Sequence, residues 1–131
     1  AVDGSWMAVA VAAAAVIGHC YPVWFGFAGG KGAATAVGVA AALSPVLLWP
    51  GLGAWLLVAT LTGFVGLATI VAAVTMPIFV FLTRGPEQPA LLAFLSVLAL
   101  FIIFTHRSNV ARMLRREEHR MTGLMLLRRS R

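Results

Sequence analysis

The stretch GAATAVGVAAALSPVLLWPGLGAWLLVATLTGFVGLATIVAAVTMPIFVFLT, residues 32–83, contains no Asp, Glu, Lys, Arg or His. As one continuous helix these 52 residues would extend about 78 Å, more than twice the ~30 Å hydrocarbon core of a bilayer. Interleaved Pro, Gly and Trp residues, without a strict polar alternation, favour helices over a β-barrel. The whole chain is 61% hydrophobic and 11% charged, against about 25% charged residues in soluble domains. The sequence therefore predicts an all-α, polytopic membrane helix bundle.

Breaks rich in Gly and Pro divide the chain into about five predicted membrane spans. These spans lie near residues 6–24, 33–49, 51–65, 67–83 and 90–106. An alternative makes residues 51–83 one long tilted helix. The positive-inside rule favours five crossings, because five crossings place the Lys31 loop and the arginine-rich tail on the same, cytoplasmic side. The predicted organisation is a membrane domain over residues 1–106, with its N-terminus outside, followed by a basic cytoplasmic tail over residues 107–131.

The excess positive charge of the chain is confined to this tail. Residues 107–131 contain eight Arg and two Glu, which equals the formal net charge of +6 of the whole sequence. Because the rest of the chain belongs in lipid, this charge does not indicate a nucleic-acid partner. Apolar residues recur in the tail at helical spacing, namely Val110, Met113, Leu114 and Met121. The pattern predicts an amphipathic helix that lies on the anionic inner leaflet.

A glycine-rich loop, GFAGGKGAAT over residues 26–35, contains the single lysine of the sequence, Lys31. Glycines allow backbone N–H groups to turn toward one point and allow an anion to approach closely. A helix that begins directly after the loop would direct the positive end of its dipole to the same point. The loop therefore predicts a phosphate site. It is not a Walker A loop, since Phe25 and Gly32 stand where that motif needs Gly and Ser or Thr. A flexible turn whose lysine only sets the membrane topology remains the alternative.

A second candidate cluster follows the last predicted span. If that helix continues, His106, Asn109 and Arg112 lie on one face at i, i+3 and i+6. This polar stripe would lie at the cytoplasmic surface, level with the glycine-rich loop. A histidine at a membrane interface can also be a structural anchor, so both roles stay open.

Two further polar positions lie at predicted helix ends. Thr69, in the segment GLATI, offers a hydroxyl at the other cytoplasmic turn, and His19 lies one turn before Pro22 at the end of the first span. The sequence has too few Asp and Glu for a metal cage or a carboxylate pair, no Cys/His cluster with zinc spacing, and no His-x4-Asp pair. It therefore predicts neither a metal nor a cofactor.

Three segments together resemble motifs of the membrane-integral bacterial acyl-phosphate:glycerol-3-phosphate acyltransferases. GHCYPVWFGFAGGKGAAT, residues 18–35, is similar to the motif G-H-x-x-P-x-x-x-x-F-x-G-G-K-G-x-A-T of that family. HRSNVARMLRREEHR, residues 106–120, is similar to its signature H-R-x-N-I-x-R-L-L-x-G-x-E-x-K, with Arg116 in place of Gly. GLATI is similar to its S-L-x-S-I turn, with Gly66 in place of the first Ser. The resemblance covers essentially the whole chain.

The resemblance implies transfer of a fatty acyl group from acyl phosphate to the sn-1 hydroxyl of glycerol 3-phosphate, giving lysophosphatidate for phospholipid synthesis. It implies catalytic roles for His106, Asn109 and Lys31. The residues expected to bind substrate phosphate are Gly29, Gly30, Lys31, Gly32, Thr35, Arg107 and Arg112. The residues expected to support the site are His19, Pro22, Phe27, Thr69 and Glu118. The expected partners are the two substrates and membrane lipids, and the expected location is a bacterial inner membrane.

Members of this family have seven spans and an earlier cytoplasmic loop with the pattern G-S-G-N-x-G-A-T-N-x-L-R, to which nothing in this sequence corresponds. Removal of the first two spans would leave five with the N-terminus outside, in agreement with the charge bias. We therefore expect a truncated copy whose site lacks the residues of that loop. An inactive fragment, or a non-catalytic transporter or lipid-binding subunit, remains the alternative. The uncharged run over residues 32–83 argues against a transporter, which needs ionisable groups at mid-membrane depth.

Overall fold

The computed structural model describes residues 4–26 and 29–121. Every regular element within these ranges is helical. The α-helices are α1 (Gly4–Cys20), α2 (Ala33–Leu43), α3 (Leu48–Thr62), α4 (Val65–Arg84), α5 (Pro89–Thr105) and α6 (Arg107–Leu114). Three single 3-10 turns are η1 (Val23–Phe25), η2 (Pro45–Leu47) and η3 (Gly85–Glu87). The predicted all-α class is confirmed.

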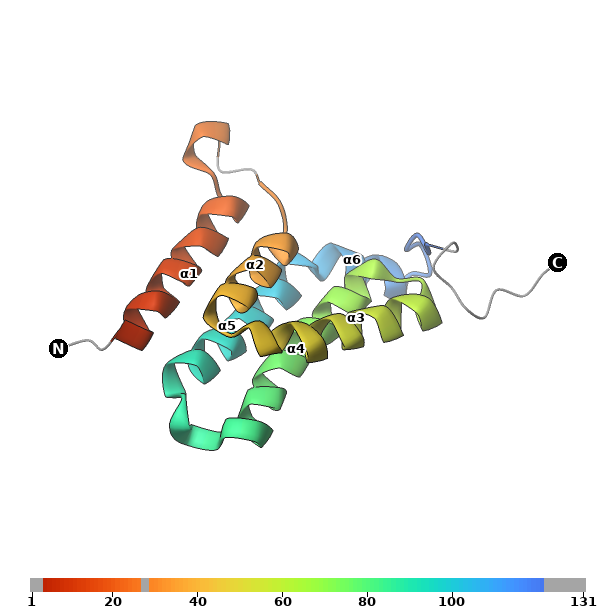
Figure 1. Cartoon of the computed structure of the whole chain (residues 1–131). Helices are drawn as coiled ribbons and strands as arrows, with labels where there is room; N and C mark the ends of the chain where they lie inside the picture. Colours follow the sequence, from red (N-terminus) through yellow and green to blue (C-terminus); the bar gives the residue numbers. More distant parts are fainter. Residues whose placement is uncertain (1–3, 27–28, 122–131) are drawn as a thin grey trace.

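The helices form one bundle in which successive long elements alternate in direction (Figure 1). α4 packs between α3 and α5, and α1 packs against α5 and α2. Contacts of α6 and the segment after it reach both the loop before α2 and the turn between α3 and α4. One end of the bundle therefore contains the C-termini of α1, α3 and α5 and the N-termini of α2 and α4. We call this the α6 end. This is the alternation that five successive crossings require.

The interfaces between the helices are built largely from small side chains. The buried alanines are Ala12, Ala36, Ala40, Ala59, Ala68, Ala72, Ala73, Ala90 and Ala99. Small residues allow helix backbones to approach closely, as is typical of helices packed in membranes. Large apolar side chains instead point outward: Leu57, Phe81 and Leu100 are each more than half exposed. A soluble bundle would bury such residues, so this surface is suited to contact lipid.

The helices differ in their capacity to cross a bilayer. By length and hydropathy, three described stretches could do so, namely Ser5–Phe25, Pro45–Thr62 and Val65–Glu87. α5 and α6 form a fourth candidate if the two helices, bent by 54°, count as one span. α2 has 11 residues, about 16 Å of helix, which is shorter than the ~30 Å core. Four of the five predicted spans thus correspond to candidate spans, and the second is a short helix.

The predicted helix over residues 33–49 is wrong at its C-terminal end. Ser44 has an extended backbone with φ −160° and ψ 96°, as the residue before Pro45 favours, and α2 stops there. After the turn η2, α3 begins early enough that Pro50 lies in its first turn, where a helix tolerates proline. The break therefore lies at the first proline of the segment and not at the second.

Gly63 separates α3 from α4. Its φ of 73° lies in the left-handed region that glycine adopts without strain, and its N–H donates to the carbonyl oxygen of Ala59 at 2.8 Å. The alternative of one long helix over residues 51–83 is therefore wrong. The first span is also not one regular helix to residue 24, since α1 ends at Cys20 and η1 follows.

α6 accounts for the first part of the predicted amphipathic tail helix. Val110 and Met113 are half-buried on this helix. Met121 is not part of it, because the chain turns after α6 and the N–H of Met121 donates to the carbonyl oxygen of Gly63 at 2.8 Å. The prediction that Met121 continues the helical stripe is wrong. Residues 122–131 of the predicted tail lie outside the described residues.

Candidate active site

Close packing against the end of α1 explains two glycines of the loop before α2. A Cβ on Gly29 would lie 2.1 Å from the carbonyl oxygen of His19 and 2.8 Å from Cδ of Pro22. A Cβ on Gly30 would lie 2.7 Å from Nε2 of His19. His19 and Pro22 thus define the path of the loop by direct contact. Phe27, which the resemblance assigns a supporting role, lies outside the described residues.

Gly32 connects this loop to α2. Its φ of 82° is left-handed, and its carbonyl oxygen accepts the first hydrogen bond of the helix, from the N–H of Ala36 at 2.8 Å. α2 therefore begins directly after Lys31, as predicted, and its N-terminal N–H groups face the α6 end. Thr35, a predicted phosphate ligand, is half-buried in the first turn of α2.

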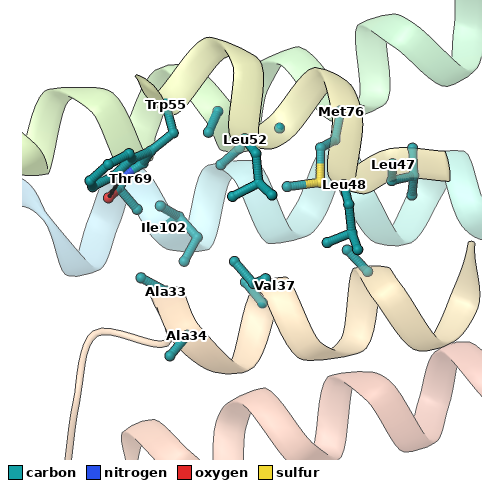
Figure 2. A pocket seen from close by; sticks show the side chains of 15 residues that line it. Ala33, Ala34, Val37, Leu47, Leu48, Leu52, Trp55, Thr69, Met76 and Ile102 are labelled. Atoms are coloured by element: carbon teal, nitrogen blue, oxygen red, sulfur yellow. Dashed lines mark hydrogen bonds between the residues drawn. The ribbon is translucent and has the colours of Figure 1, made fainter. Parts of the chain in front are cut away.

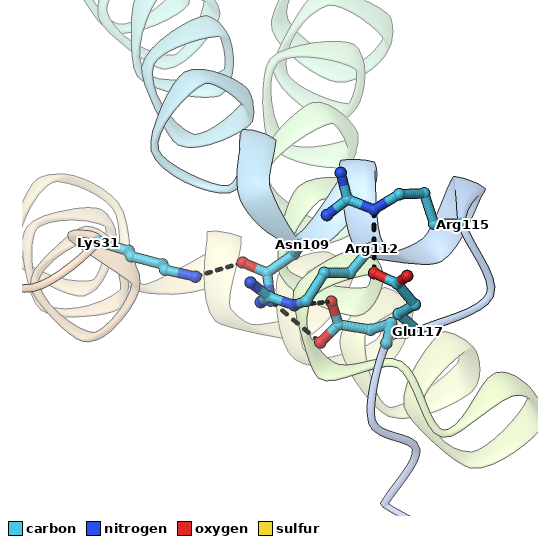
Figure 3. Close-up of polar contacts among 6 residues, drawn as sticks. Lys31, Asn109, Arg112, Arg115 and Glu117 are labelled. Carbon is cyan, nitrogen blue, oxygen red and sulfur yellow. Dashed lines mark hydrogen bonds and ion pairs between the residues drawn. The ribbon is translucent and has the colours of Figure 1, made fainter.

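Lys31 is held from the C-terminal part of the chain at two points. Its ammonium group donates a hydrogen bond to Oδ1 of Asn109, as Figure 3 shows. Its backbone oxygen accepts a hydrogen bond from Oγ1 of Thr105 at 2.9 Å. The structure thus brings the lysine loop and the predicted polar stripe together. Thr105 is not among the residues predicted for the site, although it directly precedes the histidine of the C-terminal motif.

His106 lies at the break between α5 and α6 and is only 5% exposed. Its Nδ1 is 2.9 Å from the carbonyl oxygen of Ile102. Because a carbonyl oxygen can only accept, Nδ1 carries the proton and Nε2 is left as an acceptor. In this tautomer Nε2 of His106 can accept a hydrogen bond or a proton.

The side-chain amide of Asn109 is oriented by two partners of opposite character. Its oxygen accepts from the lysine ammonium, and its Nδ2 donates to Oε1 of Glu118 at 3.3 Å. Since an ammonium only donates and a carboxylate only accepts, the two ends of the amide cannot exchange. Glu118 also accepts from Nε of Arg112 at 3.0 Å, so Arg112, a predicted phosphate ligand, is paired with a carboxylate (Figure 3).

A left-handed turn after α6 brings Glu118 back beside Asn109 and Arg112. The N–H of Glu117 donates to the carbonyl oxygen of Arg112 at 2.7 Å, and the N–H of Arg116 donates to that of Met113 at 3.1 Å. These two bonds define a Schellman motif, in which Arg116 occupies the left-handed position with φ 60°. The family signature has glycine at this position. The departure at Arg116 therefore places a side chain in a backbone conformation that favours glycine.

An open cavity of about 350 Å³ lies where these elements meet. The residues that line it are Lys31, Val65, Gly66, His106, Asn109, Glu118, His119 and Met121. A Cβ on Gly66 would lie 2.9 Å from Cβ of Asn109, so the glycine at the family's serine position makes room for the amide. The first turn of α4, which contains Val65 and Gly66, also lines the cavity with the N-terminus of that helix. The cavity thus combines an ammonium group, an imidazole, an oriented amide and the first turn of α4.

Two predicted site residues have partners away from this cavity. The hydroxyl of Thr69 donates to the carbonyl oxygen of Val65 at 3.0 Å and accepts from Nε1 of Trp55 at 3.2 Å. The guanidinium of Arg107 donates to the carbonyl oxygen of Phe104 at 2.8 Å and lies 4.2 Å above the ring of Phe104. The structure therefore does not bring Thr69 or Arg107 to Lys31.

A second cavity, of about 170 Å³ and almost entirely apolar, lies among α2, α3, α4 and α5. Figure 2 shows Ala33 and Ala34 at the end where the loop enters α2, and Leu47 farther along the bundle. The apolar cavity thus starts within three residues of Lys31. Among the described residues, no group of three His, Cys, Asp or Glu side chains is placed to hold a metal ion.

The family model described as glycerol-3-phosphate acyltransferase matches residues 1–116 of the chain. A protein of that name from Syntrophotalea carbinolica is 43% identical over 111 residues, and one from Burkholderia pseudomallei is 46% identical over 120 residues. These alignments cover 85% and 90% of this chain, but 56% and 59% of the two relatives. The chain thus spans little more than half the length of the curated relatives that it matches.

Two crystal structures of PlsY (YgiH), an integral membrane glycerol 3-phosphate acyltransferase, have the same fold with a TM-score of 0.84. The glycerol 3-phosphate form is 39% identical, and the match covers 91% of this chain and 58% of that chain. The lysophosphatidic acid form is 38% identical, and the match covers 94% of this chain and 62% of that chain. These matches confirm the predicted class of membrane helix bundle. The chain belongs to the glycerol-3-phosphate acyltransferase family.

Proposed function

We propose that this chain carries the catalytic cavity of an acyltransferase that moves a fatty acyl group from acyl phosphate to the sn-1 hydroxyl of glycerol 3-phosphate. The products would be lysophosphatidate and inorganic phosphate. The observation that supports this best is the convergence of Lys31, His106 and Asn109 on one cavity at the α6 end. The family membership supports the acceptor, and the PlsY structures that match include a glycerol 3-phosphate form.

Lys31 and the loop around it would bind a substrate phosphate. Among the described residues the ammonium donates to the neutral amide oxygen of Asn109 and forms no ion pair with a carboxylate. An entering phosphate would replace that contact by a stronger, charge-assisted hydrogen bond. Backbone N–H groups of Gly29, Gly30 and Gly32 would add further hydrogen-bond donors. This arrangement suits an anion with several oxygens.

His106 would accept the proton of the attacking hydroxyl at Nε2. The hydroxyl oxygen forms the new ester bond to the acyl carbon, the bond from that carbon to the phosphate oxygen breaks, and phosphate leaves with the electron pair. The acyl phosphate is already an activated anhydride, so positioning and charge stabilisation supply most of the catalysis. The phosphate of glycerol 3-phosphate is an alternative acceptor for the proton. Asn109 would orient the acceptor or the phosphate through its fixed amide.

The apolar cavity would hold part of the acyl chain of the donor. It begins at Ala33, two residues after Lys31, so a phosphate at the loop and a hydrocarbon chain in the cavity could belong to one molecule. Its lining contains no charged side chain. An acyl chain in this cavity would leave water for an apolar surface, which favours binding.

We further propose that the protein lies in a bacterial inner membrane with the α6 end toward the cytoplasm. Six of the seven described Lys and Arg residues lie at that end, namely Lys31 and the arginines of residues 107–120. The positive-inside rule places such an end in the cytoplasm. The alternation of the helices then places the N-terminus of α1 on the outer side.

Reconstitution tests the proposal directly. The chain is inserted into lipid vesicles, alone and together with the N-terminal half of a family member, and supplied with palmitoyl phosphate and labelled glycerol 3-phosphate. Transfer of label to lysophosphatidate is expected in the supplemented sample. Lys31→Ala should reduce the rate by roughly 30- to 1,000-fold, the equivalent of about 2–4 kcal/mol for one donor to a developing charge.

A matched control is Arg115→Gln, which removes an exposed cation that pairs with Glu117 outside the cavity. Its activity should stay near that of the unaltered chain. An absence of transfer with both preparations, or an unchanged rate in Lys31→Ala, would contradict the proposed function. A neutral result for His106→Gln would instead assign the proton to the substrate phosphate.

A further inference from the structure

The turn η1, which follows α1, presents three consecutive apolar side chains outward. Val23, Trp24 and Phe25 are 67%, 92% and 75% exposed. We call these three residues the aromatic turn. A Cβ on the next residue, Gly26, would meet no atom within 4 Å, and Figure 1 shows the turn projecting beyond the other helices at the end of α1. The described residues thus leave the side chains of the aromatic turn largely uncovered.

Local structure fixes this outward position. Pro22 precedes the turn with φ −70° and ψ 126°, and Gly26 ends it in the left-handed conformation with φ 64°. The N–H of Phe25 donates to the carbonyl oxygen of Pro22 at 3.2 Å and closes the turn. An unstructured segment could fold its aromatic side chains onto the bundle, whereas this hydrogen-bonded turn holds them away from it.

The exposed tryptophans mark two levels along the bundle. Trp24 lies at the α6 end, whereas Trp6 near the start of α1 and Trp49 near the start of α3 lie at the other end, 43% and 79% exposed. Between Trp6 and Cys20, α1 rises about 21 Å, and η1 lies beyond it. The two levels are therefore separated by a distance close to the ~30 Å core of a bilayer. Tryptophans at both membrane–water interfaces are typical of integral membrane proteins.

The charge at the α6 end of the bundle matches an anionic surface. Residues 29–32 and 105–121, which form the α6 end, contain six Lys and Arg residues but two Glu residues. Among the described residues, the connection at the other end, residues 84–88, contains one Arg and one Glu. Clusters of cations beside exposed aromatic side chains bind the headgroup region of leaflets rich in anionic lipid.

We propose that the aromatic turn inserts into the headgroup region of the anionic leaflet at the α6 end and holds the Lys31 loop at headgroup depth. The loop starts one residue after the turn, and its other end is tied to α5 by the hydrogen bond from Thr105 to Lys31. The depth of the turn therefore sets the depth of the loop from its N-terminal side. This partner is a lipid surface, and the proposal does not depend on acyl transfer.

Tryptophan quenching in vesicles tests the insertion. The full chain carries Trp24 as its single tryptophan, with Trp6, Trp49 and Trp55 replaced by Phe, in vesicles of phosphatidylcholine and phosphatidylglycerol. Lipids brominated near the headgroup should quench Trp24 more strongly than lipids brominated near the end of the acyl chain. A matched control retains Trp55 as the single tryptophan; this residue is half-buried and donates to Thr69. Lipids brominated near the headgroup should not quench Trp55 more strongly than lipids brominated near the end of the acyl chain.

Two results would overturn the insertion. Emission typical of water without quenching would place the turn in solvent. Emission of a buried indole without quenching would show that protein, such as a second copy of the chain, covers it. If the triple Phe variant does not fold, a spin label on Trp24→Cys in a Cys20→Ala chain reports the same depth from its accessibility to oxygen and to a nickel chelate.

A spin label on Lys31→Cys, again with Cys20→Ala, tests the effect on the loop. With the aromatic turn intact, the label should report headgroup depth. After Val23→Ser, Trp24→Ser and Phe25→Ser, the nickel accessibility of the label should rise as the loop moves toward water. An unchanged accessibility would show that the turn does not set the depth of the loop.

Discussion

Replacement of Arg116 by glycine isolates the energetic effect of the left-handed turn after α6. A non-glycine residue in this conformation costs about 1–2 kcal/mol, which Arg116→Gly removes. The greater freedom of glycine in the unfolded chain offsets about 0.4–1 kcal/mol of that gain. The midpoints of these two ranges leave the Schellman turn more stable by about 0.8 kcal/mol, which corresponds to a roughly fourfold change in its opening equilibrium, within a range of about two- to fivefold.

Amide hydrogen exchange measures this opening at the groups that the turn protects. The N–H of Glu117, bonded to Arg112, and the N–H of Met121, bonded to Gly63, should exchange about two- to fivefold more slowly in Arg116→Gly. Arg116→Ala is the matched control, because it removes the same guanidinium but retains Cβ, and it should leave exchange unchanged. Equal rates in both variants would refute the reasoning, since they would show that backbone strain does not limit the turn.

Three further outcomes follow from the site and the packing around it. Gly66→Ala should lower kcat/KM about tenfold or more, because the new Cβ would displace Asn109. Gly53→Ala is the control and should leave kcat/KM unchanged, because its Cβ would meet no atom within 4 Å. Equal kcat/KM values for the two variants would contradict this prediction. If His106 is the base, the rate should fall as acid protonates Nε2, near the ordinary imidazole pKa of about 6.5; a rate that stays constant between about pH 5 and 8 would contradict this assignment. Thr69→Ala should lower the free energy of unfolding by about 1 kcal/mol, because the indole N–H of Trp55 loses its acceptor, and should leave kcat unchanged. A large loss of kcat would instead indicate that Thr69 acts in the active site.

Much of the fold could be predicted from the absence of charge and from the positions of glycine. The turn at Gly63 was visible because a glycine interrupts an apolar run, and the structure places it in the conformation that glycine favours. The C-terminal end of α2 could not be predicted in the same way, because Pro45 and Pro50 give similar local signals. A proline in the first turn of a helix is tolerated, so composition alone cannot distinguish a break from a helix start.

The candidate site was predictable where spacing along one chain segment decides geometry. The juxtaposition of Lys31 with Asn109 follows from the membrane topology and from helical spacing after the last span. The backbone contact of Thr105 and the turn at Arg116 did not show in the sequence, because they depend on the exact approach of two segments and on a conformation unusual for arginine. Likewise, spacing could not reveal that Arg107 stacks on Phe104, since a flexible side chain selects its partner only in the packed structure.

The ammonium and the amide that face each other are 78 positions apart in the chain. A ribosome must therefore synthesise α5 and α6 before Lys31 can contact Asn109. An intermediate without these two helices lacks the residues that α5 and α6 contribute to the cavity. If the cavity binds an anion as proposed, binding would begin only after α5 and α6 have been made, so its onset during translation would report the arrival of Asn109 at the lysine loop.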